Sequence, residues 1–439
     1  MSALPAHISV FTRLPQPGRS KTRLIPALGE AGAATLQREM TEHVVRQALV
    51  VRATGGARVE ARIADGATAP ARRWLSVPCT TQGEGNLGER LERALVAGAR
   101  RSAVALVVGG DCPTVTAADL RATAAAAKEA GAAIIPAADG GFCALALRAD
   151  LARSARGLLG GVAWGTERAG AQTLERVHAV CPTVVAMPTR ADIDLPKDLP
   201  LWRAVRRAWY EPPVSLAVVV PVLDEATALP ALIERLAAEG ARVVVADGGS
   251  TDGSGDVARA AGATVVIGPT GRGAQLNAGA AAATADALLF LHADTRPPDG
   301  FARLVLDALA DPETSLGAFR FSVDSDAPFM RLVETGTRLR GALLGMPYGD
   351  QGLFCRRVLF EALGGFAPYP VMEDYELVRR ARRVGRIRVL PQAAPTSDRR
   401  WREQGVWRWT ALNLATIARY HLGTSPDELA EWRRAHSKR

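Results

Sequence analysis

Asp294 is the first candidate for chemistry, because it ends an apolar run and precedes two prolines in ADALLFLHADTRPP (285–298). Aspartate is a common turn residue, and on that interpretation it only closes a strand. The other interpretation is chemical, since a carboxylate at the carboxyl end of a central strand faces the crevice where open α/β sheets bind ligands. A phosphorylated ligand would be repelled there unless a divalent cation bridged the charges, which makes Asp294 a candidate metal ligand.

Three more motifs of the C-terminal half have residue types that suit a nucleotide. VVVPVLDEA places Glu225 just after an apolar run, and in VVVADGGSTDGS the run ends on Asp247 before a Gly/Ser/Thr turn. GRGAQLNAGA opens a helix with glycines and carries Arg272 and Asn277. Acidic groups at successive strand ends can reach a base and a ribose, while glycine turns and helix N-termini offer donors to phosphate.

Two later motifs leave a chemical and a structural interpretation open. In YPVMEDYELVRRARRVG the pair Glu373 and Asp374 precedes an arginine-rich helix, and acidic residues commonly cap such a helix. SDRRWREQGVWRWTALN carries Arg399 and Arg400, whose guanidinium forks match phosphate oxygens but could equally form a solvated face. The tryptophans of this motif either stack on a sugar or belong to the core.

The N-terminal half has a set of its own. TRLPQPGRSKTRLIPALG is a Pro/Gly turn with Arg13, Lys21 and Arg23, which suits a triphosphate unless the loop is merely solvated. Lys21 stands out because nearly all of the 54 basic residues are arginine. The run AVALVVGGD ends on Asp111, and DIDLPKDL adds Asp194 late in this half.

Short β-rich runs that alternate with Ala/Leu-rich helical segments must position these residues. HISVFTRL and AVALVVGG in the first half, and VSLAVVVPV, GARVVVAD and DALLFL in the second, predict mainly parallel sheets with flanking helices. The proline-bounded segment DLPKDLPLWRAVRRAWYEPPVS between the halves predicts a helix and a linker. We therefore expect two Rossmann-like α/β domains, residues 1–205 and 206–439, with the boundary at about 205–213.

Composition excludes several classes of protein. The 439 residues exceed what one hydrophobic core usually serves, and 48% hydrophobic with 23% charged content is that of a globular protein. The net charge of +9 comes with no nucleic-acid-binding signature, so we expect no nucleic acid as a partner. Five scattered cysteines without a CxxC pair argue against a zinc site or a disulfide framework and favour a reducing cytoplasm.

The chain also lacks the marks of export or of a membrane span. It has no signal-peptide pattern and no apolar run near the roughly 20 residues that cross a bilayer, so we expect a cytoplasmic protein. WRWTALNLATIARYHLG is amphipathic enough for peripheral contact with a membrane, although packing on a core would explain its apolar face as well.

In this order, DGGSTDGS, GRGAQLNAGA, FLHADT and MEDYELVRRARRVG resemble the family-2 glycosyltransferases of the GT-A fold, most closely the arsenosugar-biosynthesis type, over residues 214–435. The resemblance implies that Glu225 and Asp247 contact the nucleoside. It also implies that Asp294 binds Mg²⁺ or Mn²⁺ as the last position of a DxD-type motif, whose first position is His292 here.

The same resemblance implies the chemistry. Asp374, beside Glu373, would take the proton of an acceptor hydroxyl in a single displacement that inverts the anomeric centre. The tryptophan-rich motif lies where many members of the family bind acceptor or diphosphate, which adds Gln404 and Trp409 to Arg399 and Arg400, with a spacing one residue wider than usual.

In the first half, GGDCP, PAADGGFCALALR, AWGTERAGAQTL and DIDLPKDL resemble an uncharacterised family related to GT-A nucleotidyltransferases, the DUF2064 type, over residues 7–200. The resemblance implies that Asp111 and Asp194, or Asp192 in place of the latter, hold a divalent cation. The implied reaction is attack of a phosphorylated substrate on an NTP, which gives a nucleotide-activated product and pyrophosphate.

Together the resemblances predict a bifunctional enzyme with two GT-A domains in tandem. The first domain would make or handle the activated donor, and the second would transfer sugar from a nucleotide sugar to a small-molecule or lipid-linked acceptor. The alternative is a single-activity glycosyltransferase whose first half is a non-catalytic nucleotide-binding or docking module. A further variant acts at the membrane surface.

Overall fold

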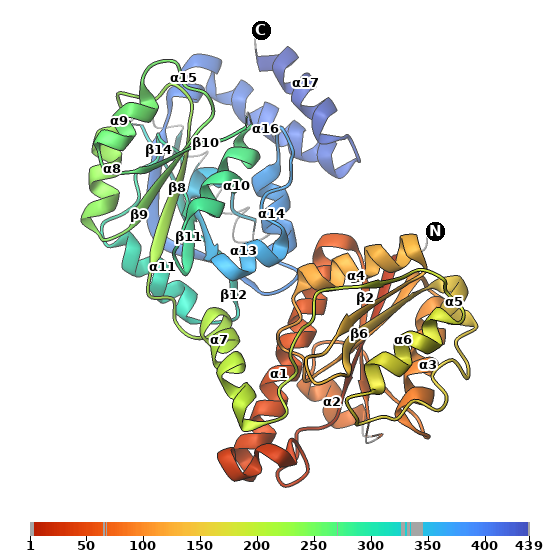
Figure 1. Cartoon of the computed structure of the whole chain (residues 1–439). Coiled ribbons are helices and arrows are strands. Elements are labelled where there is room, and N and C mark those ends of the chain that lie inside the picture. Colours follow the sequence, from red (N-terminus) through yellow and green to blue (C-terminus); the bar gives the residue numbers. More distant parts are fainter. Residues whose placement is uncertain are drawn as a thin grey trace. The chain divides into compact units, whose positions relative to one another are not determined.

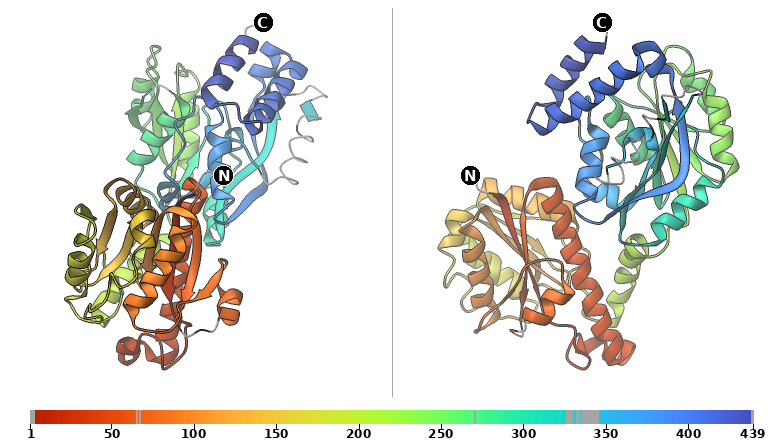
Figure 2. Two further views of the ribbon diagram at one scale, coloured as in Figure 1. Left: turned by 90° about the vertical axis from the view of Figure 1, so that its right-hand side faces the viewer. Right: turned by 180° about the vertical axis from the view of Figure 1, so that it is seen from behind.

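A computed structural model describes residues 4–437 except 65, 67, 270, 326–329, 332–333 and 335–345. The chain forms two compact units, Met1–Arg207 and Ala208–Arg439 (Figure 1). Each unit has its own sheet, with helices on both faces, as the two further views show (Figure 2).

Unit 1 is built on seven strands. In sheet order they are β3 (Cys79–Thr81), β2 (Arg58–Ile63), β1 (Leu4–Thr12), β4 (Ser102–Gly109), β6 (Phe142–Arg148), β5 (Ala132–Pro136) and β7 (Val184–Ala186). The helices are α1 (Ile25–Gly55), α2 (Thr68–Trp74), α3 (Leu87–Ala99), α4 (Ala117–Ala130), α5 (Ala149–Arg153), α6 (Ala169–His178) and α7 (Leu199–Tyr210), with short 3-10 turns η1 (Thr22–Leu24) and η2 (Pro196–Asp198).

Both faces of the central strand β4 are buried, which explains its unbroken apolar sequence. Ala105 and Val107 pack with α3 and α5, while α1 and α4 pack together and cover other parts of the sheet. Because successive side chains of a strand point to opposite faces, a strand with helices on both sides needs apolar residues at every position.

Unit 2 repeats this design. In sheet order its strands are β10 (Thr264–Ile267), β9 (Arg242–Asp247), β8 (Leu216–Val222), β11 (Ala287–Phe290), β13 (Leu353–Arg356), β12 (Thr314–Asp324) and β14 (Arg386–Ser397). Its helices are α8 (Leu229–Ala238), α9 (Ser254–Ala260), α10 (Arg272–Ala282), α11 (Phe301–Ala310), α13 (Arg357–Leu363), α14 (Glu373–Ala381), α15 (Arg399–Gln404), α16 (Val406–His421) and α17 (Pro426–Ser437), with a 3-10 turn η3 (Gly349–Gln351).

The two sheets share one topology. Numbered within each unit, the order is 3-2-1-4-6-5-7 in both, and only the sixth strand runs antiparallel to its neighbours. The first and fourth strands are parallel neighbours, so the loops after them leave the same edge at the point where the strand order reverses. This is where open α/β sheets bind ligands. The predicted fold class, two mainly parallel α/β units, is confirmed.

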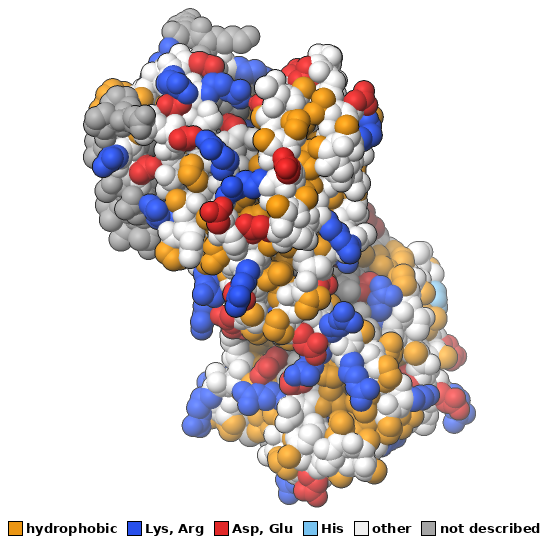
Figure 3. All heavy atoms as spheres, turned by 90° about the vertical axis from the view of Figure 1, so that its left-hand side faces the viewer, with side chains coloured by type: hydrophobic (Ala, Val, Ile, Leu, Met, Phe, Trp, Pro, Cys, Tyr) orange, Lys and Arg blue, Asp and Glu red, His pale blue; other side chains and the backbone are white. Residues whose placement is uncertain are grey.

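The predicted amphipathic segment forms α16, which buries Leu412 and Thr416 and leaves Trp407 70% exposed. Among the described helices, none combines the length and the apolar character needed to cross a bilayer. On the face drawn in Figure 3, basic and acidic side chains are interspersed rather than separated by sign.

Candidate functional site

A cavity of about 690 Å³ opens at this edge of unit 2. Its walls come from the loops after β8 and β11, the first turn of α10, the N-terminus of α14 and the helices α15 to α17. Seven of the sequence-predicted site residues line it, from segments far apart in the chain: Glu225, Arg272, Asp294, Glu373, Asp374, Arg399 and Trp409.

Asp374 is held in a fixed orientation at the N-terminus of α14. Its Oδ2 accepts a hydrogen bond of 2.7 Å from the Gly349 N–H, and its Oδ1 accepts one of 2.7 Å from the Tyr375 N–H. A Cβ at position 349 would lie 3.0 Å from Asp374 Oδ2 and 3.4 Å from His292 Nε2, so a larger residue would crowd these two side chains. The loop after β11 and the proposed base therefore meet at Gly349.

Glu373, the neighbour of Asp374, is almost completely buried, with 3% of its surface exposed. Burial and the charge of Asp374 raise its pKa to about 7, although Arg272 Nη1, 3.6 Å from Oε1, favours the ionised form. A Cβ on Gly273 would lie 3.4 Å from Glu373 Cβ and 2.9 Å from the Ala367 carbonyl oxygen. The glycine-rich start of α10 thus permits the close packing that buries this carboxyl.

Arg399 contributes a positive charge to the cavity wall beside Glu225. Its Nη2 donates to Glu225 Oε1 at 3.2 Å, and this bond, followed by the charges of Glu225 and Asp294, raises the Arg399 pKa. The Ser397 N–H donates to the carbonyl of Asp294 at 3.2 Å, which joins the end of β14 to the loop after β11. An arginine predicted to bind diphosphate therefore lies among the predicted nucleoside and metal ligands.

Asp247 and Asn277 are not in the cavity lining. Asp247 Oδ1 accepts three hydrogen bonds within its own turn, from the N–H groups of Gly249 and Ser250 and from the Ser250 hydroxyl. Burial opposes ionisation, but these donors hold its pKa below the usual range. The carboxylate therefore organises the turn that follows β9.

The amide of Asn277 is also engaged by the protein. Nδ2 donates to the Phe366 carbonyl at 2.9 Å, and Oδ1 accepts from the Phe366 N–H at 2.8 Å. These bonds fasten α10 to the loop before α14. Both ends of the Asn277 amide thus bond to the backbone, and the predicted nucleotide contact of this residue stays a prediction.

The turn after β9 is bound tightly to the loop after β8. Ser250 Oγ accepts from the Asp224 N–H, Ser254 Oγ accepts from the Glu225 N–H, and Asp252 Oδ2 accepts from the Ala226 N–H, at 2.9–3.0 Å. The motif DGGSTDGS thus holds the backbone around Glu225 in place, because its hydroxyl and carboxylate oxygens accept hydrogen bonds from residues 224–226.

The C-terminal helices add a residue that the sequence analysis missed. Arg433 of α17 lines the cavity, donates to Asn413 Oδ1 at 3.0 Å and lies over the Trp409 ring at 5.2 Å. Trp401, one of the tryptophans for which a sugar contact and core packing were left open, lines the cavity and packs on Phe321. Arg433 belongs to no recognisable motif, and only its place on α17 opposite α16 could have indicated it. The predicted side chains of Arg400 and Gln404 lie outside the described part.

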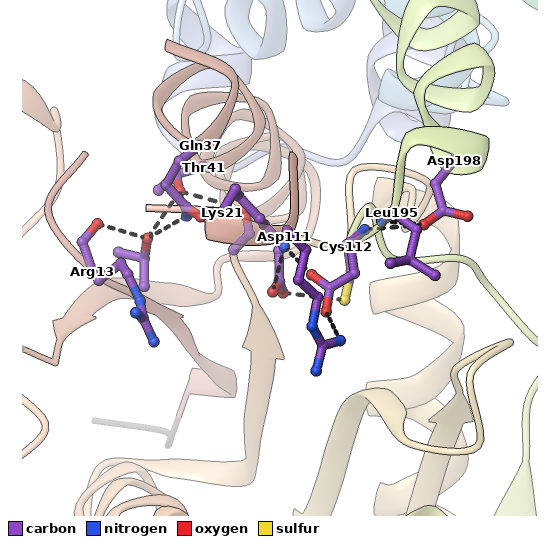
Figure 4. A network of polar contacts seen from close by, with 12 residues as sticks. Arg13, Lys21, Gln37, Thr41, Asp111, Cys112, Leu195 and Asp198 are labelled. Atoms are coloured by element: carbon purple, nitrogen blue, oxygen red, sulfur yellow. Dashed lines mark hydrogen bonds and ion pairs between the residues drawn. The ribbon is translucent and has the colours of Figure 1, made fainter. Parts of the chain in front are cut away.

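Unit 1 has a smaller polar site at the equivalent edge of its sheet (Figure 4). Lys21 Nζ donates to Asp111 Oδ2 at 3.1 Å and to Asp194 Oδ1 at 2.5 Å. The lysine side chain is 7% exposed, whereas the two carboxylates are 41% and 36% exposed. Three residues predicted from distant motifs therefore form one cluster.

Charge governs the protonation of this cluster. Although burial favours the neutral amine, Asp111 and Asp194 raise the pKa of Lys21 above its usual value. Burial opposes ionisation of Asp111, but the Lys21 charge holds its pKa below the usual range. Burial, followed by the charges of Asp139, Asp111 and Asp194, raises the pKa of Asp192 to about 6. The single ammonium of Lys21 thus does not neutralise all the carboxylates of this cluster.

Backbone contacts hold the two acidic loops together. The Ile193 N–H donates to the Asp111 carbonyl at 3.1 Å, and Asp198 Oδ2 accepts from the N–H groups of Asp194 and Leu195 at 3.1 and 2.8 Å. Figure 4 shows Asp198 at this turn. Asp198 was missed by the sequence analysis, although an aspartate four residues after Asp194 is a common way to organise a turn.

The three basic residues predicted from the first loop differ in burial and in their contacts. Arg23, whose side chain is 67% exposed, approaches Asp194 Oδ2 at 3.5 Å. Arg13 is exposed, and the Thr12 hydroxyl donates to its carbonyl at 3.3 Å. Arg23 therefore lies at the cluster, and Lys21 is its buried member.

Backbone strain is concentrated at both sites. Among the described residues, three other than glycine have a positive φ: Lys21 (46°), Asp224 (55°) and Met372 (70°). Lys21 holds the ammonium, Asp224 precedes Glu225, and Met372 precedes Glu373. Such conformations cost of order 1–3 kcal/mol each and persist where the surrounding structure enforces them, commonly at functional sites.

Either site could take a divalent cation with few protein ligands. Within the described part of the chain, no three His, Cys, Asp or Glu side chains are grouped so that they could hold a metal by themselves. Mg²⁺ in nucleotide sites typically takes one or two carboxylates and completes its shell with phosphate oxygens and waters. Asp294 in unit 2 and the pair Asp111 and Asp194 in unit 1 suit that chemistry.

Solved structures with a similar fold include a proposed nucleotide-diphospho-sugar transferase from Desulfovibrio desulfuricans G20, 24% identical with a TM-score of 0.42 over 46% of this chain and 88% of its own. Glucosyl-3-phosphoglycerate synthase from Mycobacterium tuberculosis, in complex with Mn²⁺, UDP and glucosyl-3-phosphoglycerate, is 22% identical with a TM-score of 0.33, over 42% and 71%. Mannosyl-3-phosphoglycerate synthase from Rubrobacter xylanophilus is 17% identical with a TM-score of 0.28, over 41% and 66%.

Comparison with protein families finds two matches. Residues 35–166 match the family described as "Uncharacterized protein conserved in bacteria (DUF2064)", and residues 217–365 match glycosyl transferase family 2. A comparison with curated proteins finds no match. The two family matches fall one in each unit, and both units have the same order of strands. Unit 1 therefore contains a DUF2064 domain and unit 2 a domain of glycosyl transferase family 2, each built on an α/β sheet of the same strand order.

Proposed function

We propose that unit 2 transfers a sugar from a nucleotide sugar to an acceptor hydroxyl, with inversion at the anomeric carbon. The observation that carries this proposal is that Asp294, within the segment that matches glycosyl transferase family 2, and Asp374, on α14 after that segment, line one cavity. A general base and a diphosphate-binding wall are the two parts that a single displacement requires.

In the proposed step Asp374 accepts the proton of the acceptor hydroxyl while that oxygen forms a bond to the anomeric carbon. The bond from this carbon to the diphosphate oxygen breaks, and its electron pair leaves with the nucleoside diphosphate. Because Gly349 and Tyr375 fix both carboxylate oxygens from the backbone, Asp374 needs no reorientation to act.

The acidic and basic residues of the wall have separate proposed tasks. Asp294 would hold Mg²⁺ or Mn²⁺, which neutralises charge on the departing diphosphate. Glu225 would contact the nucleoside, and Arg399 would exchange its ion pair with Glu225 for diphosphate oxygens, which guanidinium forks match. Trp409, which lines the cavity beneath the Arg433 guanidinium, would contact the acceptor.

The experiment contrasts Asp374→Asn with Asp294→Ala. The first variant keeps size and polarity but cannot accept the proton, so turnover should fall about 10²–10⁴-fold while donor binding survives. The second should lose most of the increase in nucleoside diphosphate affinity that Mn²⁺ gives the native chain. Calorimetry with UDP and GDP measures binding, and donor hydrolysis measures turnover if the acceptor stays unidentified.

Asp307→Asn is the matched control, since Asp307 is 70% exposed on α11 and pairs with Arg303 at 3.5 Å, one turn away on the same helix. It should leave both measurements unchanged. Equal loss of donor binding in Asp374→Asn and Asp294→Ala would give Asp374 a structural role. Full activity in Asp294→Ala would return Asp294 to its interpretation as a turn residue.

We infer a second activity for unit 1, the binding of an NTP or nucleotide sugar. The cluster of Lys21, Asp111 and Asp194 at the edge where the strand order reverses supports it. In nucleotidyl transfer an oxygen of a phosphorylated substrate would attack the α-phosphorus, and the bond to pyrophosphate would break. Unit 1 would then supply an activated donor to unit 2, and the alternative of a non-catalytic nucleotide-binding or docking module predicts binding without pyrophosphate release.

A further inference from the structure

The ammonium of Lys21 lies between the two carboxylates that, by the family resemblance, would hold a divalent cation. It bridges Asp111 Oδ2 and Asp194 Oδ1, which belong to the loops after β4 and before η2. The two carboxylate oxygens that accept its hydrogen bonds come from separate loops, and Mg²⁺ or Mn²⁺ takes such oxygens as ligands beside phosphates. Lys21 is thus a stand-in for the cation within the chain itself.

Exposure is distributed unequally over this ion pair. The side chain of Lys21 is 7% exposed, whereas those of Asp111 and Asp194 are 41% and 36% exposed. A cation from solvent can therefore reach the carboxylates without first crossing the lysine. Since an exposed carboxylate keeps much of its hydration and gains little from the ion pair, exchange of its partner costs little.

The backbone of Lys21 gives an independent indication. Its φ of 46° and ψ of 50° are left-handed, a conformation that costs energy for a long side chain. The residue lies just before η1, and its carbonyl accepts a hydrogen bond of 2.8 Å from the Leu24 N–H, so the turn holds the side chain towards the two carboxylates.

We propose that Lys21 is a tethered cation that a divalent metal displaces from Asp111 and Asp194, and that the displaced ammonium then faces the anion that accompanies the metal. The proposal rests on the proposed cation-binding role of unit 1. Before exchange the cluster has Asp111, Asp192 and Asp194 against Lys21 and Arg23, so it repels a phosphate. After exchange the metal adds two positive charges and Lys21 becomes available, so the anion binds only once the metal is in place.

Unit 2 has a related arrangement at the same edge. Arg399 donates to Glu225 at 3.2 Å, and the charge of Asp294 acts on it as well. In both units a basic side chain of the chain itself lies among carboxylates near the ends of the first and fourth strands. Lys21 bridges two carboxylates, whereas Arg399 bonds to one, so exchange with a metal is best tested at Lys21.

The experiment measures the reactivity of Lys21 towards an acylating reagent in the full chain. The sequence has four lysines, Lys21, Lys128, Lys197 and Lys438, so mass spectrometry can follow each one. We expect Lys21 to be protected without metal and its acylation rate, relative to Lys128, to rise at least about tenfold with saturating Mn²⁺, since bonds between charged groups are worth about that factor or more. Asp294→Asn is introduced throughout to remove the proposed metal site of unit 2.

Two variants calibrate the result. Asp111→Asn should raise the acylation of Lys21 without metal, and Mn²⁺ should then add little. Lys21→Met should bind Mn²⁺ more tightly than the native chain, by at least about tenfold in a titration of free Mn²⁺ followed by electron paramagnetic resonance. Lys197→Met, an exposed lysine three residues beyond Asp194, is the matched control and should leave Mn²⁺ affinity nearly unchanged.

The outcomes separate the exchange from the site. If Mn²⁺ binds to Asp111 and Asp194 but Lys21 stays protected, the exchange is wrong and the cation site stands. If no Mn²⁺ binds to unit 1 at all, both are wrong. Neither result bears on sugar transfer by unit 2, which is measured through Asp374→Asn. The acylation arm uses native Lys21, so it remains decisive even if Lys21→Met fails to fold.

Discussion

Glu373 illustrates how a single buried carboxyl makes the stability of the folded chain depend on pH. Its pKa of about 7 in the folded chain compares with 4.5 in an ordinary glutamate, because burial and Asp374 both disfavour the charge. Below pH 4.5 the group is protonated in the folded and the unfolded chain alike. Between pH 4.5 and 7 the folded chain holds a proton that the unfolded chain has released, so the stability gained from this group is lost as the pH rises.

We therefore expect Glu373→Gln to gain stability relative to the native chain as the pH rises from 5 to 8. The shift of about 2.5 pKa units, taken from the two values above, corresponds to at most about 3 kcal/mol, and a gain of about 1–3 kcal/mol is expected. Thermal unfolding at the two pH values measures it as a shift of several degrees.

Glu361→Gln is the control for this comparison, because Glu361 is 57% exposed and pairs with Arg357 on the surface of α13. Its variant should show no comparable dependence on pH. A constant difference between Glu373→Gln and the native chain from pH 5 to 8 would mean that Glu373 is ionised throughout, in which case Arg272 outweighs burial.

At this scale the sequence predicted the residues that carry charge at strand and helix ends, and much less of what surrounds them. Asp294 and Asp374 follow from local patterns, whereas Arg433 lies in a charged helix like many others. The ion pairs of Lys21 and Arg399 could not be predicted either, since their partners are 90 and 174 residues away in the chain. Long-range partners depend on the loops, which carry no periodic signal.

The contact between α10 and the loop before α14 shows how elements cooperate. Asn277 binds both backbone groups of Phe366, and a Cβ on Gly365 would lie 2.5 Å from Asn277 Oδ1. Phe366 itself packs edge to face on Phe290 of β11, with ring centroids 4.8 Å apart. The position of Glu373 and Asp374 thus depends on a helix nearly a hundred residues earlier.

Asn277→Ala should cost about 1–3 kcal/mol, because two partly buried backbone groups of Phe366 lose their partner. Asn277→Asp should cost less, since it keeps the acceptor for the Phe366 N–H. Chemical denaturation measures both, and calorimetry with a nucleoside diphosphate should show little direct loss. A large loss of nucleotide affinity with unchanged stability would instead restore the nucleotide contact predicted from the sequence.

Elements were easier to predict than their partners. The apolar runs identified β1, β4, β8, β9 and β11, because strands buried on both faces have unbroken apolar sequences. The strands β6 and β13 are antiparallel to both of their neighbours, and this direction could not be recognised from one sequence. Direction within a sheet is set by the length and course of the connections rather than by the residues of the strand.

For the whole molecule, separate sheets and cores predict separable units. The boundary after Arg207 falls within α7. Trp202 of α7 packs on His43 of α1, whereas the Glu211 carbonyl accepts a hydrogen bond from Arg356 in unit 2, so a cut after Tyr210 keeps the helix whole. We expect fragments 1–210 and 211–439 each to fold, and donor hydrolysis by the second to stay within about threefold of the native chain.

The first fragment decides between the two proposals for unit 1. Release of pyrophosphate from an NTP, with Mg²⁺ and a screen of sugar phosphates, would favour nucleotidyl transfer, and binding without release would favour the non-catalytic module. Collapse of hydrolysis by fragment 211–439, despite an intact circular dichroism spectrum, would mean that unit 1 is needed for the chemistry of unit 2.

The shared strand order has a consequence for biosynthesis. Two sheets of one design in a single chain invite misassembly, in which a strand joins the wrong sheet, a known hazard of repeated domains. Here the last strand of the first sheet, β7, ends at Ala186, and the first strand of the second, β8, begins at Leu216. No strand of either sheet is interleaved with the other along the chain. A ribosome therefore completes every partner of the first sheet before it makes any competitor, and the order of synthesis itself keeps the two sheets apart.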